Sequence, residues 1–321
     1  EVVFVIDTSG SMEGQPLEQA KTALLDALGR LTPEAHFNVI EFNSITRKLA
    51  STSVAATPDA LGRAAAFVRR LYATGGTEIA SALAAALDGN TAAGRLRQVV
   101  FLTDGSVGNE AALLRQIDAS RGDARLFTVG IGAAPNTYFM REAAASGRGT
   151  YTYIGAIDEV EPRMRVLFEK LEHPVLTDLT LTGAGGDALA YAPDPMADLY
   201  AHEPLLVSVK HARETAALTF RGRLRDATWS SELTLGGGEP ARGLDVLWAR
   251  NRIASLERSA SRGAPPDAVT AAITALGLEY HLVTAHTSLV AVDVTPARPA
   301  QRQAVERAIA LKRPHGWDMP I

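Results

Sequence analysis

The sequence predicts a doubly wound α/β domain with a mostly parallel sheet, followed by a smaller β-sandwich-like domain that has a helical insertion. Through about residue 171, apolar runs of strand length alternate with amphipathic helical patterns, as in parallel sheets covered by helices on both faces. Beyond His173-Pro174, short segments of alternating polarity with glycine-bearing breaks replace this pattern. We therefore expect one domain at 1–172 and a β-rich domain at 173–321, with a helical segment around 241–277.

The elements of the first domain follow from its hydrophobic patterning. Residues 2–6 form an uninterrupted apolar run, which is typical of a parallel strand buried on both faces. Thr57-Pro58 is an N-cap followed by a proline in the first helical turn. Further strands are predicted at 37–42, 45–49, 98–103, 125–131 and 151–154. Helices are predicted at 16–31, 58–72, 77–87, 110–120, 136–145 and 158–171.

The second domain is predicted from shorter segments. Residues 178–182 alternate between polar and apolar side chains, as in an antiparallel strand with one face in water. Strands are expected at 175–181, 205–211, 216–220, 227–235 and 289–294. Between the last two, we expect one helix that carries the apolar residues 244–256 and another at 267–276.

Composition excludes several classes of protein. The chain has 321 residues, 46% of them hydrophobic, and a net charge of −4, so no broad basic surface for nucleic acid is expected. It contains no cysteine, which excludes disulfides and thiolate metal sites. No apolar run is long enough to span a bilayer. The chain opens on a core strand without an initiator methionine. We therefore expect a fragment or a processed product, and export remains open.

Three oxygen donors follow the first predicted strand. Asp7, Ser9 and Ser11 lie at alternating positions beyond its end, where α/β sheets bind ligands. Thr77 and Asp104 lie in two distant segments, a glycine-rich turn before a helix and the end of the strand at 98–103. Hard oxygen donors suit magnesium, calcium or manganese. The serines and the threonine could individually be helix caps, but all five residues together favour a metal site.

This set of residues resembles the metal-ion-dependent adhesion site of von Willebrand factor A domains, and all five positions of that pattern are filled. The resemblance implies a Rossmann-like fold and bound Mg²⁺, or Mn²⁺ or Ca²⁺. It also implies that Ser9, Ser11 and Thr77 ligate the ion directly, whereas Asp7 and Asp104 act largely through water. A carboxylate from an Asp or Glu of a partner protein would then complete the coordination sphere.

The second half of the chain resembles one subgroup of these proteins. The similar elements are the stretch around Tyr191 with Asp198-Leu199-Tyr200, then 247–250 and 287–293. This subgroup contains the inter-alpha-trypsin inhibitor heavy chains and bacterial surface proteins that are sortase targets. It implies an upstream VIT domain in the full-length protein and an extracellular, cell-surface or periplasmic location. However, the chain has neither the Asp-Pro-His processing signal of the heavy chains nor a sortase sorting signal.

The main alternative is an enzyme, because a metal bound by carboxylates and hydroxyls could also activate water. The chain lacks the H-E-x-x-H, G-x-S-x-G and G-x-x-x-x-G-K motifs. Gly130-Ile131-Gly132 begins like a dinucleotide fingerprint, but Pro135 stands at its third glycine position. We therefore expect an adhesion module that is not an enzyme and has no catalytic residues. The alternatives are an intracellular subunit of a chelatase- or AAA-type machine and, less favoured, a metal-dependent hydrolase.

Overall fold

The computed structural model describes residues 1–91, 94–105, 108–172, 176–183, 185–200, 204–211, 217–224, 227–236, 238–239, 241–261 and 263–290. Its first half forms a seven-stranded sheet of order β3-β2-β1-β5-β6-β7, with β4 also paired to β2. Neighbouring strands are parallel except β3 and β4, which run antiparallel to β2. The strands are β1 (Val2–Asp7), β2 (His36–Phe42), β3 (Thr46–Lys48), β4 (Val54–Ala55), β5 (Gln98–Thr103), β6 (Arg125–Ile131) and β7 (Arg148–Ile154).

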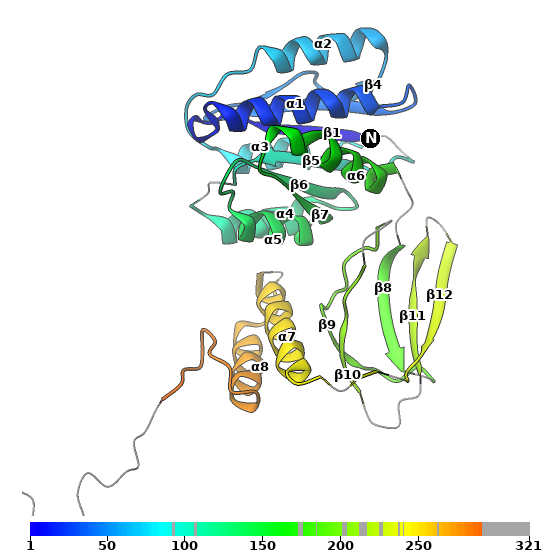
Figure 1. Ribbon diagram of the computed structural model, residues 1–321. Coiled ribbons are helices and arrows are strands. Elements are labelled where there is room, and N and C mark those ends of the chain that lie inside the picture. Colours follow the sequence, from blue (N-terminus) through cyan, green and yellow to red (C-terminus); the bar gives the residue numbers. More distant parts are fainter. Residues whose placement is uncertain are drawn as a thin grey trace, which may run out of the picture.

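Helices cover both faces of this sheet (Figure 1). One face packs against α1 (Gln15–Arg30), α2 (Pro58–Arg69) and α6 (Val160–Glu172). The other packs against α3 (Ile79–Ala86), α4 (Glu110–Ser120) and α5 (Thr137–Ser146). Successive residues of β1 point to opposite faces, so Phe4 joins the first core and Val5 the second. This confirms the predicted doubly wound α/β fold.

Within the residues that the structure describes, the second half contains two antiparallel sheets and two helices. One sheet has the order β12-β11-β8 and the other pairs β10 with β9. Leu181, Leu218 and Tyr191 come from both sheets and share one hydrophobic cluster, as in a sandwich. The strands are β8 (Leu176–Gly183), β9 (Ala190–Ala192), β10 (Ser208–Lys210), β11 (Ala217–Leu224) and β12 (Ala227–Thr234).

The helices α7 (Leu244–Ser261) and α8 (Pro266–Glu279) pack on each other around Trp248 and Ile273. They follow β12 in the chain. The strand predicted at 289–294 would make them an insertion, but residues 289 and 290 are not in a strand and 291–294 lie outside the described residues. No helix in the described part of the chain is both long and apolar enough to cross a membrane.

The two halves meet at the edge of the large sheet where β6 and β7 begin. The first residue of β6, Arg125, forms an ion pair with Asp198 at 2.6 Å, and both side chains are buried. Tyr200 packs edge-on against Phe127 and belongs to the first core of the α/β half. Its hydroxyl donates a hydrogen bond to the carbonyl of Arg148, the first residue of β7. The second half is therefore attached at the end of the sheet opposite to that where β1 ends.

Candidate metal centre

The site is centred on Asp7, the last residue of β1. Because β1 is a central strand between β2 and β5, the Asp7 side chain is fully buried although it lies at the edge of the sheet. Its Oδ1 accepts a hydrogen bond from the backbone N–H of Ser9 at 2.8 Å. Its Oδ2 accepts one from the hydroxyl of Thr103 at 2.6 Å. Two donors thus fix the orientation of the carboxyl group.

Ser9 and Ser11 place their hydroxyls side by side. The two Oγ atoms are 3.1 Å apart, and Ser11 is exposed whereas Ser9 is buried. Ser9 is the N-cap of the short 3₁₀ helix η1 (Gly10–Met12), yet its side chain makes no capping hydrogen bond. The alternative in which this serine serves as a helix cap therefore has no support in the local geometry.

Backbone hydrogen bonds bring the segment of Thr77 to the same edge. The N–H of Thr74 donates to the carbonyl of Thr8 at 2.8 Å, and the N–H of Gly10 donates to the carbonyl of Gly75 at 3.1 Å. Gly75 has a φ of 75°, and a Cβ there would lie 2.7 Å from the Ser44 Oγ, so only glycine fits this turn. Thr77 is half-buried and precedes Glu78, which is the N-cap of α3.

Asp104 is brought to Asp7 because β1 and β5 are adjacent parallel strands whose carboxyl ends share one edge. The Asp104 side chain is half-buried, and its carbonyl accepts a hydrogen bond from the N–H of Asn136. The structure thus gathers the loops of all five predicted residues at one edge of the sheet. Direct polar contacts link Asp7 to Ser9 and Ser9 to Ser11. Thr77 and Asp104 are placed there by their backbone and by the sheet.

Thr103 also belongs to the site, although the sequence pattern did not single it out. Its fully buried hydroxyl donates to Asp7 and also accepts the N–H of Gly105 at 2.9 Å. It thereby ties the end of β5 to the end of β1. The available signal was a hydroxyl residue in an otherwise apolar run, directly before Asp104. Its partner depends on the pairing of β1 with β5, which the local sequence does not specify.

The chemistry of the donors fits a divalent cation. Burial raises the pKa of Asp7, the hydrogen bonds from Thr103 and Ser9 oppose this, and the nearby Asp104 charge adds to it. A buried carboxylate beside a second one is costly unless positive charge compensates it. Among the described residues, no group of three or more His, Cys, Asp or Glu side chains could hold a metal ion. A cation at this edge would therefore depend on hydroxyl oxygens as well as carboxylates, which suits Mg²⁺, Mn²⁺ or Ca²⁺.

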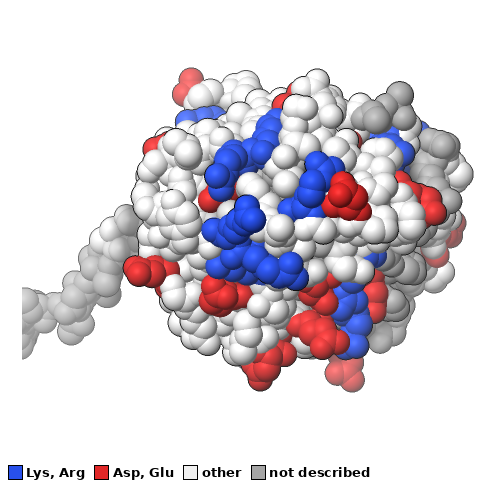
Figure 2. Space-filling view, turned by 90° about the horizontal axis from the view of Figure 1, so that it is seen from above, with Lys and Arg blue, Asp and Glu red and all other residues white. Residues whose placement is uncertain are grey.

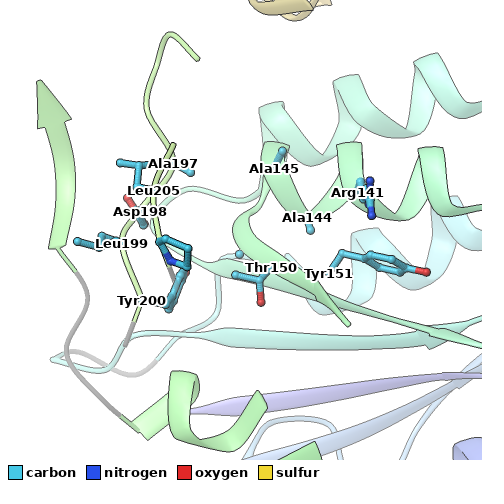
Figure 3. Close-up of a pocket in the computed structure, with 12 residues that line it drawn as sticks. Arg141, Ala144, Ala145, Thr150, Tyr151, Ala197, Asp198, Leu199, Tyr200 and Leu205 are labelled. Atoms are coloured by element: carbon cyan, nitrogen blue, oxygen red, sulfur yellow. The ribbon is translucent and has the colours of Figure 1, made fainter. Parts of the chain in front are cut away.

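A cavity of about 380 Å³ lies at the junction of the two halves. Figure 3 shows Asp198, Leu199 and Tyr200 on one side of it and Thr150 and Tyr151 on the other. On the α/β half it is lined by α5 and β7. On the other half it is lined by the segment that contains Asp198, the ion-pair partner of Arg125. Because it lies where β7 begins, it is separate from the edge that gathers the oxygen donors.

Together, the doubly wound sheet and the oxygen donors beyond β1 define a von Willebrand factor A-type domain, and comparison with known proteins agrees. A family model for the von Willebrand factor type A domain matches residues 1–153. The solved structure of a von Willebrand factor type A protein from Catenulispora acidiphila superposes with a TM-score of 0.57 and 21% identity, covering 87% of this chain and 79% of that one. Residues 1–153 therefore form a von Willebrand factor type A domain.

Curated relatives extend the similarity into the second half. Inter-alpha-trypsin inhibitor heavy chain H3 of Bos taurus is 27% identical over 321 residues, which cover 90% of this chain and 36% of the relative. The human heavy chain H3 is also 27% identical, with 97% of this chain and 38% of the relative covered. A von Willebrand factor A domain-containing protein of Dictyostelium discoideum is 27% identical, covering 64% of this chain and 22% of its own length. The chain thus spans between about a fifth and two fifths of these relatives.

Proposed function

We propose that this protein binds a partner protein through a divalent cation held beyond β1, with an Asp or Glu of the partner as a ligand. The domain itself is a protein-interaction module. The observation that supports a metal-dependent form is the buried Asp7 carboxyl, oriented by Ser9 and Thr103 beside two adjacent serine hydroxyls.

The residues of the proposed site would have two different roles. Ser9, Ser11 and Thr77 would offer neutral hydroxyl oxygens to the cation, and Asp7 and Asp104 would supply negative charge, largely through water. Neutral ligands leave a divalent cation attractive to a further carboxylate, which is the chemistry the ion supplies. Thr103 would keep Asp7 oriented, as outer-sphere partners of metal ligands do. This role requires no catalytic residue, and we propose that the protein is not an enzyme.

Calorimetric titration with MgCl2, MnCl2 and CaCl2 tests the metal site. We expect wild type to bind at least one of these ions, whereas Asp7→Ala and Asp104→Ala lose binding. Asp267→Ala is the matched control, because this aspartate is exposed in the first turn of α8. Unchanged binding in both site variants would disprove the assignment.

We further propose that the chain is part of a longer exported or surface protein, bacterial in origin, in which a VIT domain precedes it. The supporting observation is the similarity to inter-alpha-trypsin inhibitor heavy chains across both halves of the chain. Fractionation of cells that express the full-length gene tests this location. Recovery of the protein in the cytosolic fraction alone would exclude it.

A further inference from the structure

One flank of the metal centre carries exposed arginines. Arg69 ends α2, and Arg70 is its C-cap; both are exposed and make no ion pair with any residue that the structure describes. Arg47 in β3 lies against the last turn of the same helix, since its guanidinium is 5.1 Å from the ring centroid of Phe67 of α2. Figure 2 looks onto the face covered by α1 and α2 and shows basic side chains gathered there. We call Arg47, Arg69 and Arg70 the arginine flank.

The arginine flank is connected to the loop after β1 by two sets of hydrogen bonds. Arg47 donates to Glu41 Oε2 at 2.8 Å, and Glu41 Oε1 accepts the hydroxyl of Thr8 at 3.2 Å. On the other side, Arg70 is followed within the same loop by Thr74, whose N–H is bonded to the Thr8 carbonyl. Thr8, the residue that directly follows Asp7, is thus linked to Arg47 through Glu41 and contacts the loop that follows Arg70.

The charges around the centre are unequal. Arg47 is neutralised in part by Glu41, but Arg69 and Arg70 add uncompensated positive charge on the α2 side. On the α3 side, the exposed Glu78 follows Thr77. Cations at the C-terminus of a helix favour the helix itself, which explains one or two basic residues there. It does not explain the exposed apolar side chains that lie two residues from Arg47 and Arg70 in the chain: Ile45 and Tyr72 are each 70% exposed.

We propose that the partner is an acidic protein segment whose further carboxylates lie on Arg69 and Arg70 while one carboxylate occupies the metal. This inference rests on the proposed function and specifies how the partner segment is oriented on the site. Its acidic residues lie toward α2, away from Glu78. An apolar residue between them contacts Tyr72 or Ile45. Charge complementarity of this kind sets partner choice and association rate more than total affinity.

Two synthetic Gly-Ser peptides test the proposal with the full chain in MgCl2. One has a single central Asp, and the other has the same Asp with glutamates added on one side. We expect the acidic peptide to bind about fivefold more tightly at low salt, as two exposed ion pairs of modest strength would give. The double variant Arg69→Gln/Arg70→Gln abolishes this difference, and 0.5 M NaCl does so in wild type because exposed charges are then screened.

The matched control is Arg163→Gln/Arg165→Gln, which removes two exposed arginines from α6 instead. It should keep the preference for the acidic peptide, and thermal melts verify that all variants are folded. If both peptides bind equally in a Mg²⁺-dependent manner, the inference is wrong while the proposed function stands. If the acidic preference survives in Arg69→Gln/Arg70→Gln, another surface is responsible and the inference is also wrong. If EDTA changes neither peptide's binding, the proposed function itself fails.

Discussion

Replacing Thr103 by valine separates the role of this hydroxyl from that of the proposed metal ligands. Valine has nearly the same shape as threonine, so the packing of β5 is kept while two hydrogen bonds are lost, those to Asp7 Oδ2 and from the N–H of Gly105. A bond to a charged acceptor contributes about 1.5–3 kcal/mol, and a buried N–H left without a partner costs about 1–3 kcal/mol. The free energy of unfolding should therefore fall by about 3 kcal/mol or more.

Urea unfolding in EDTA measures this loss, and calorimetry measures the second expected effect. Because an outer-sphere partner orients the ligand, Mg²⁺ affinity should fall about 10- to 100-fold. Thr103→Ser is the control, since it keeps the hydroxyl and removes one methyl group at a cost of about 1 kcal/mol. If Thr103→Val matched Thr103→Ser in both stability and Mg²⁺ affinity, Thr103 would not orient Asp7 and our account of the site would fail.

Two further predictions concern Asp7 and the junction of the two halves. Burial, together with the Asp104 charge, raises the pKa of Asp7, so between its unfolded and folded pKa values the folded state binds more protons. In EDTA, wild type should gain stability as pH falls into that window. Asp7→Asn should lack this gain, and in EDTA at pH 7 it should be more stable than wild type. MgCl2 should not stabilise it further. An Asp7→Asn protein that is less stable than wild type in EDTA would contradict this reasoning. Tyr200→Ala removes a ring that is 4% exposed and packs on Phe127, so the free energy of unfolding should fall by about 3–5 kcal/mol. The control Tyr72→Ala removes an exposed ring and should change the free energy of unfolding by less than about 0.5 kcal/mol. Scanning calorimetry of the two variants and wild type measures both effects.

The parts of the fold that sequence patterning predicted are those governed by local signals. The apolar run of β1 and the Thr57-Pro58 helix start both appear in the structure, because buried strands and helix caps have signatures within a few residues. The oxygen donors at 7, 9 and 11 followed from their position beyond such a strand. Their assignment to one ion with Thr77 and Asp104 needed the resemblance, since nothing local joins segments this far apart.

What local patterning could not predict depends on long-range pairing. Thr103 acts through the register between β1 and β5, and a threonine in a strand is otherwise ordinary. Asp198 and Tyr200 stood out only through the subgroup resemblance, yet they anchor the second half to β6 and β7. From the sequence alone, Asp198 cannot be distinguished from an exposed aspartate. Its burial is tolerated because Arg125, a residue distant in the sequence, pairs with it.

The anchor formed by Asp198 and Tyr200 has a mechanical consequence. A partner held beyond Asp7 and the second half, attached through Asp198 and Tyr200, would pull on opposite ends of the sheet, so tension would run lengthwise along the strands. Neighbouring parallel strands then resist by shear, with the ladder hydrogen bonds between β1, β5 and β6 loaded together rather than opened one at a time. Such a geometry bears load well, and the first contact to yield under force should be the coordination bond to the partner rather than the fold.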